Sequence, residues 1–234
     1  MPIVRAMGPM PTMRGVLHQW AAIPALLGGG VLVAQARRPR CRLAAGLFAG
    51  SLVVQFAVSA AYHRRIWGRR GDVVMRRLDH AAIFVLIAGT YTPVCLLALE
   101  PETGKAVLTR VWIGAGRGVA MALAWPGALR PLWAARYVGL GWTIAPHFRE
   151  AARGLGAAKL ALVALGGVLY TAGAFIYAAR RPNPVPGVFG FHELFHALTL
   201  GAAAAHYAVV ARLVREHGGG KAELGPGDQP LSST

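Results

Sequence analysis

The segment that decides the fold is "DHAAIFVLIAGTYTPVCLLAL", residues 79–99. After one aspartate and one histidine, nineteen residues follow without a charged side chain. An α-helix rises about 1.5 Å per residue, so a run of this length crosses a hydrocarbon core about 30 Å thick. The whole chain agrees with this, because 55% of its 234 residues are hydrophobic and only 15% are charged, which is too apolar for an ordinary soluble domain. We therefore expect an integral membrane protein.

Further apolar segments on both sides of this one predict an all-α fold, a bundle of seven transmembrane helices within residues 15–213. The predicted spans are 16–36, 43–62, 78–99, 107–125, 132–146, 157–179 and 191–213. No signal-peptide cleavage pattern precedes the first span, so we expect it to be retained. Residues 1–14 form a tail, and the Gly-, Pro- and Ser-rich residues 214–234 are predicted to be disordered.

The fourth predicted span is the weakest, because it contains Arg110 and Arg117. An arginine near the middle of a membrane costs a few kcal/mol unless it faces protein or reaches the interface. We expect Arg117 to face the bundle or to reach a membrane surface.

The formal net charge of +16 is carried mainly by short connections such as residues 63–77, "HRRIWGRRGDVVMRR". This placement favours contact with anionic lipid headgroups and excludes a nucleic-acid-binding module, which would gather its basic residues on one folded surface. Lysine and arginine divide almost equally between the two sides, although the densest loop favours a cytoplasmic N-terminus. The two cysteines, Cys41 and Cys95, form no disulfide or metal-binding pattern and are expected to be free thiols.

Polar residues inside the spans are expensive in lipid and mark positions with a partner or a function. In the second span Ser51, Gln55, Ser59 and His63 recur every four residues, which stacks them on one helix face. The last span repeats the pattern, and we expect both faces to point inward. The shared face of that last span carries His192, His196, Thr199 and His206.

His63 ends the second predicted helix, Asp79 opens the third, and His192 and His196 open the seventh. These residues lie on the same side of the membrane only if the chain crosses it an even number of times between them. Consecutive helices alternate in direction, and seven spans satisfy this condition. The polar residues thus predict that the weak fourth span does cross the membrane.

Three histidines at one depth predict a zinc site with His63, His192 and His196 as ligands, because neutral imidazoles suit Zn²⁺ and two of these residues lie one helix turn apart. Three protein ligands leave an open position for water. Asp79 would act there as general base or orient the water, and Ser59 would donate a hydrogen bond to the water or to a substrate carbonyl. Asp79 and Ser59 are therefore the candidate catalytic residues.

A simpler interpretation is that His192 and His196 are hydrogen-bonded residues between helices without a metal. His206 lies deeper in the same span and is expected to make a structural hydrogen bond. His18 and His147 lie near span ends and are expected to be interfacial.

Three blocks of sequence resemble the hemolysin III proteins, the bacterial branch of the progestin and adipoQ receptor family. They are "SAAYH" (59–63), "RLDHAAIFVLIAGTYTP" (77–93) and "HELFHALTLGAAAAHY" (192–207). The resemblance implies a seven-helix bundle in the bacterial inner membrane, with a cytoplasmic N-terminus and a zinc site near the cytoplasmic face. It places the ligands on His63, His192 and His196, with Asp79 and Ser59 beside them. It also implies zinc-dependent hydrolysis of membrane lipids and a part in membrane lipid homeostasis, and bacterial members of the family carry a historical hemolysin label.

Rival functions remain open at this point. The string H-E-x-x-H at residues 192–196 suits an intramembrane metalloprotease, with Glu193 as base and Asp79 as third ligand, but such an enzyme has no role for His63. A pore-forming cytolysin would need a polar path through the bundle, whereas segments such as 43–50 and 201–205 are apolar or small. A non-catalytic membrane sensor with a structural metal is the third alternative.

Overall fold

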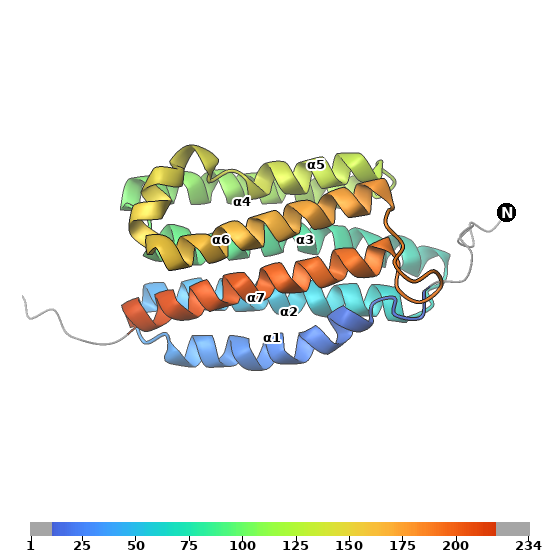
Figure 1. Cartoon of the computed structure of the whole chain (residues 1–234), viewed down its shortest axis with the longest axis horizontal. Coiled ribbons are helices and arrows are strands. Elements are labelled where there is room, and N and C mark those ends of the chain that lie inside the picture. Colours follow the sequence, from blue (N-terminus) through green and yellow to red (C-terminus); the bar gives the residue numbers. More distant parts are fainter. Residues whose placement is uncertain (1–10, 219–234) are drawn as a thin grey trace, which may run out of the picture.

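The computed structural model describes residues 11–218, and within that range the chain is helical, with one isolated β-bridge between Val185 and Phe189. Consecutive helices run in alternating directions along the long axis of the molecule (Figure 1). The elements are α1 (Val16–Gln35), α2 (Pro39–Arg64), α3 (Arg69–Leu97), α4 (Pro101–Ala124), α5 (Arg130–Gly141), the 3-10 helix η1 (Ala145–His147), α6 (Phe148–Ala179) and α7 (Phe191–Gly218).

Short connections and prolines set where these helices begin. Proline occupies the first turn of α2, α4 and α5, where its missing N–H is not needed and its fixed φ suits the helix. Connections of a few residues allow only antiparallel neighbours. At the C-terminus α7 continues to Gly218, beyond the predicted end of the last span at 213, and residues 219–234 of the predicted disordered tail lie outside the described range.

Six helical stretches among the described residues are long and apolar enough to cross a membrane. The predicted count of seven spans is therefore not confirmed. The difference arises after the fourth span, where α5 has only 12 residues, fewer than the about 20 that a helix needs to cross alone. α5, η1 and α6 together fall in one apolar stretch of 50 residues, 130–179. In space α5 and α6 lie side by side and run in opposite directions (Figure 1).

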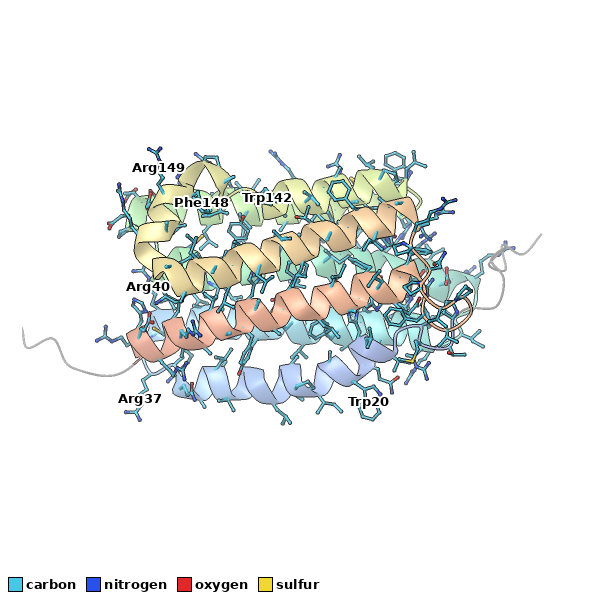
Figure 2. All side chains as sticks on the ribbon, viewed as in Figure 1. Trp20, Arg37, Arg40, Trp142, Phe148 and Arg149 are labelled. Atoms are coloured by element: carbon cyan, nitrogen blue, oxygen red, sulfur yellow. The ribbon has the colours of Figure 1, made fainter. Side chains whose placement is uncertain are left out.

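The outer surface of the bundle is apolar, as expected for a protein surrounded by lipid. Leu26, Leu27 and Phe175 are each more than 60% exposed. Trp20 points outward near the end of the bundle where α1 begins, while Arg37, Arg40 and Arg149 gather at the opposite end (Figure 2). A soluble domain would bury most of the large apolar side chains that this surface presents.

The fourth predicted span forms as α4, and it meets the criteria for crossing. Arg110 and Arg117 are both exposed on its outer face. Of the two placements expected for Arg117, the one facing the bundle is therefore wrong. The guanidinium groups lie on the side from which they can extend toward a membrane surface.

The core consists of two apolar clusters. One joins α3 to α4, α5 and α6 around Phe84 and Trp133, and the other joins α1, α2 and α7 around Phe48 and Val210. Helices α2 and α3 approach so closely that a Cβ at Gly89 would collide with the Ser51 side chain. Cys41 and Cys95 are buried free thiols, as predicted.

Candidate metal centre

Three buried histidines meet at the end of the bundle where α2 ends and α7 begins. His63 comes from the last turn of α2, and His192 and His196 come from the first two turns of α7. Each offers a ring nitrogen, and these nitrogens all lie within 4.8 Å of one another. Among the described residues, this is the group of histidine, cysteine and acidic side chains that could hold a metal ion. The sequence prediction named the same three residues.

The spacing of two of the three rings, those of His63 and His192, suits a zinc ion. Zn–N bonds are about 2.0–2.1 Å, so two nitrogens on a tetrahedral zinc lie about 3.3 Å apart. Nε2 of His63 lies 3.1 Å from Nε2 of His192. The same distance would allow one imidazole to donate a hydrogen bond to the other, which is the simpler interpretation of the sequence. The third imidazole, on His196, has no role in such a pair, whereas it completes a three-nitrogen donor set for a metal.

Asp79, near the middle of α3, faces this group. Its Oδ2 lies 3.7 Å from Nε2 of His63, and its Oδ1 is buried without a hydrogen-bond partner among the described residues. Ser59 lies one turn before His63 on α2, and its hydroxyl is among the groups that act electrostatically on the same carboxylate. Both candidate catalytic residues therefore stand beside the three histidines.

Glu193, the acidic residue of the H-E-x-x-H string, is engaged elsewhere. Its Oε1 accepts a hydrogen bond from Arg14 at 3.2 Å, and its Oε2 accepts one from the backbone N–H of Gly190 at 2.8 Å. The second bond caps the first turn of α7, as acidic residues three positions into a helix often do. With both oxygens occupied and only 1% of the residue exposed, Glu193 is a structural residue here.

His18 belongs to the site, and the sequence analysis missed it. Instead of lying at the interface, its ring is buried and stacks on His196, with centroids 3.8 Å apart and planes 6° apart. Neither ring nitrogen has a hydrogen-bond partner among the described residues. A signal was present, because His18 shares its helix face with Ala25, Gly29 and Leu32, at intervals of seven, four and three.

The other histidines make local contacts. Nε2 of His206 lies 3.3 Å from the Val163 carbonyl oxygen, the structural hydrogen bond that was expected. Nδ1 of His80 lies 2.8 Å from the Arg76 carbonyl oxygen of its own helix. Neither residue adds a ligand to the three-histidine group.

A cavity of about 470 Å³ opens at this end of the bundle, and His63, His192 and Asp79 line it. A second, apolar cavity of about 110 Å³ continues toward the middle of the bundle. Ile83, Tyr137, Ala174 and Phe195 line both cavities. His63 and His192 thus line a chamber with charged side chains in its wall, which adjoins an apolar chamber.

Comparisons with known proteins give a consistent result. A family model described as "Haemolysin-III related" matches residues 9–207. The chain is 29% identical over 164 residues to the "Hemolysin-3 homolog" of Bacillus subtilis (strain 168), covering 70% of this chain and 74% of that protein. It is 31% identical over 127 residues to "Hemolysin-3" of Bacillus cereus, covering 54% and 55% of the two chains. It is also 34% identical over 171 residues to the "Heptahelical transmembrane protein ADIPOR2" of Oryza sativa subsp. japonica, covering 66% and 74%.

Proposed function

The chain belongs to the haemolysin-III-related family, and from this premise we propose that it is a zinc-dependent hydrolase that cleaves an amide or ester bond of a membrane lipid. The observation that carries the proposal is the cluster of three buried imidazoles, two of which, His63 and His192, line one cavity together with the Asp79 carboxylate. A metal-free bundle would gain nothing from burying these four groups together, since each costs free energy in an apolar interior unless it has a partner.

In this proposal His63, His192 and His196 hold the zinc ion, and they bind it as neutral imidazoles. Bound zinc supplies a Lewis acid, which makes water a better nucleophile and polarises a carbonyl group near neutral pH. Asp79 accepts the proton of the attacking water and passes it to the leaving amine or alcohol. Ser59 donates a hydrogen bond to Asp79 and fixes the direction of its carboxylate.

The cavities support a lipid as the substrate. The chamber at the metal centre has both polar and charged walls, whereas the adjoining chamber is lined by apolar and aromatic side chains such as Leu86, Tyr170 and Phe195. An amphiphile would place its scissile bond at the polar chamber and its acyl chain in the apolar one. A water-soluble substrate would have no use for the second chamber.

For the topology, we propose that α5 and α6 cross the membrane separately, which gives seven crossings in the bacterial inner membrane with the N-terminus in the cytoplasm. Support comes from their opposite directions (Figure 1) and from the name of the rice relative, which calls that protein heptahelical. The short α5 gains length from η1, because both belong to the same apolar stretch. The metal centre then lies near the cytoplasmic face.

The metalloprotease alternative is disfavoured by Glu193, whose carboxylate oxygens accept hydrogen bonds from Arg14 and Gly190. A general base for peptide hydrolysis must be within reach of the attacking water. A pore is disfavoured by the apolar lining of the inner cavity, which offers ions no polar path.

Zinc content and lipid hydrolysis, measured on the same preparations, test the proposal. Wild type, His63→Ala, His192→Ala and the control Glu193→Ala are purified in detergent without chelators and assayed for metal and for release of fatty acid from amide- and ester-linked lipids. We expect about one zinc per chain in the wild type and in Glu193→Ala, and its loss in both histidine variants together with activity. A metal-free wild type would overturn the proposal, and zinc without turnover of either lipid class would favour the sensor.

A further inference from the structure

Two half-buried arginines on the wall of the cavity at the metal centre each have one side-chain nitrogen whose hydrogen bond is not satisfied. Arg76 on α3 and Arg130 at the start of α5 both line the cavity that holds His63, His192 and Asp79. Nε of Arg76 and one terminal nitrogen of Arg130, Nη1, are buried without a hydrogen-bond partner among the described residues. An unsatisfied buried donor costs free energy that a ligand can recover by accepting the hydrogen bond.

Arg130 is held in place by aromatic rings rather than by a carboxylate. Its guanidinium carbon lies 5.1 Å from the centre of the Tyr177 ring and 5.4 Å from the centre of the Phe191 ring. Contacts of this kind fix the orientation of a guanidinium group and leave its N–H groups free to bind an anion. The Arg130 side chain is therefore positioned before any ligand arrives.

Two acidic residues of the cavity are engaged with partners other than these arginines. Glu193 pairs with Arg14, and Asp79 faces His63. Asp72 also lines the cavity, one turn before Arg76 on α3, and makes an interaction of its own. Neither Glu193 nor Asp79 therefore neutralises Arg76 or Arg130 through the contacts that it makes.

Phosphate is the anion that suits two such groups, because its tetrahedral oxygens accept several hydrogen bonds and guanidinium groups bind them in pairs. The adjoining apolar chamber determines what carries the phosphate. Ile83 and Tyr137 line both chambers, so one molecule with a phosphate group and an acyl chain can occupy both.

We propose that Arg76 and Arg130 form a binding site for the phosphate of an anionic lipid headgroup at the mouth of the metal centre. This inference deepens the proposed function, because it gives the class of lipid that the cavity selects. The inference rests on the proposed function in one respect, namely that the bound lipid is then cleaved. Binding of the phosphate itself does not require the metal.

Binding of short-chain phosphatidic acid to the purified full chain in detergent tests the site, with the matching diacylglycerol as the phosphate-free probe. The variants are Arg76→Gln, Arg130→Gln and the double variant. Arg77→Gln is the matched control, because Arg77 is the next residue on α3, is similarly half-buried and does not line the cavity. Thermal melting and zinc content are measured for each protein, and Arg130→Lys replaces Arg130→Gln if the latter does not fold.

We expect about tenfold weaker binding of phosphatidic acid in each single variant and a larger loss in the double variant. Arg77→Gln should stay within about twofold of the wild type, and diacylglycerol binding should not change in any variant. Equal affinity of the wild type and a folded double variant would overturn the site. If inorganic phosphate binds as tightly as phosphatidic acid, the site recognises free phosphate, and the proposal that its ligand is a lipid is overturned.

A further variant separates this inference from the proposed function. His63→Ala should lose zinc yet bind phosphatidic acid within a few-fold of the wild type, since the arginines and not the metal hold the phosphate. Loss of binding in this variant would place the phosphate on the metal and overturn the arginine site. If the wild type contains no zinc, the hydrolase proposal fails while the binding comparison still decides whether the arginine site exists.

Discussion

Asp79 and His192 both face the Nε2 atom of His63. Its Oδ2 lies 3.7 Å from Nε2, and this same nitrogen lies 3.1 Å from Nε2 of His192. In many zinc sites a carboxylate instead contacts the far nitrogen of a histidine and fixes its tautomer. If zinc binds at this nitrogen, as proposed, Asp79 would therefore lie beside the ion and could act on a water there, and it would not support the ligand from the far side of the ring.

Asp79→Asn should consequently separate chemistry from metal binding. The asparagine keeps the size of the side chain but cannot accept a proton, so we expect zinc content to stay near that of the wild type while lipid hydrolysis falls by about 10²-fold or more. Metal analysis and turnover on one preparation check this. If zinc is lost as completely as in His63→Ala, Asp79 is a ligand and not the base.

Glu193→Gln should reduce stability without removing the metal. The substitution removes the ion pair between the buried Glu193 and Arg14, and we expect a loss of about 1–3 kcal/mol in the free energy of unfolding. Denaturation in detergent measures this loss. Zinc content near the wild-type value would support the structural role of Glu193, whereas its complete loss in folded protein would restore Glu193 as part of the metal centre.

The flat ring of His18 should support zinc binding by holding the His196 ring in place. Because it stacks on His196 at 3.8 Å, His18→Ala leaves a space into which the ligand can rotate, and we expect zinc affinity to fall by about tenfold. His18→Phe keeps a flat ring and should restore most of that loss. Competition with a zinc chelator measures both affinities, and His147→Ala serves as the control histidine. Failure of phenylalanine to rescue would mean that the imidazole nitrogens of His18 take part.

Gly15 should tolerate no side chain. Its φ of +75° is strained for any other residue, and a Cβ there would lie 2.6 Å from Cβ of His63. Gly15→Ala must therefore displace either the start of α1 or the ligand, and we expect weaker zinc binding and a lower melting temperature. Gly30→Ala is the matched control on α1, because a Cβ at that position meets nothing within 4 Å. Equal zinc affinity in the two variants would contradict this account.

If the chain crosses the membrane seven times, as proposed, the connection between α1 and α2 and the connection between α5 and α6 lie on the same side of the membrane. Arg37 and Arg149 lie at the same end of the bundle (Figure 2), so single cysteines at both positions should react with a membrane-impermeant reagent added from the periplasmic side. A cysteine in place of the exposed Arg65 should react only from the cytoplasmic side. Cys41 and Cys95 are replaced by alanine beforehand. Reaction of the Arg149 position from the cytoplasmic side would show that α5 and α6 do not cross separately.

The sequence allowed the metal centre to be predicted because membrane burial makes polar residues conspicuous. Ser59 and His63 on α2 and His192 and His196 on α7 each follow helical periodicity, and all four are buried. A similar argument could not reach Arg14 and Glu193, whose pairing depends on how the segment before α1 passes the start of α7. Nothing local to either residue contains that information.

The length of α5 illustrates another limit. Hydropathy over 132–146 predicted a single span, but the structure ends α5 at Gly141 and inserts η1 before α6. Hydropathy averages over a window, so it does not detect a break of a few residues within an apolar stretch. For His18, the sequence showed which residues share its helix face. It did not show that this face points into the bundle, because that depends on how α1 packs against α2 and α7.

In the proposed zinc centre, the order of the ligands along the chain also decides when the ion could bind during synthesis. His63 and His192 are 129 residues apart, and His192 lies on α7, the last of the described helices to be made. Until α7 has entered the bilayer, the nascent chain offers a single histidine of the proposed ligand set, too few to retain an ion. Under the proposed function, zinc loading is thus a late event in biogenesis that joins α7 to α2, so that chains truncated before α7 would remain without the metal.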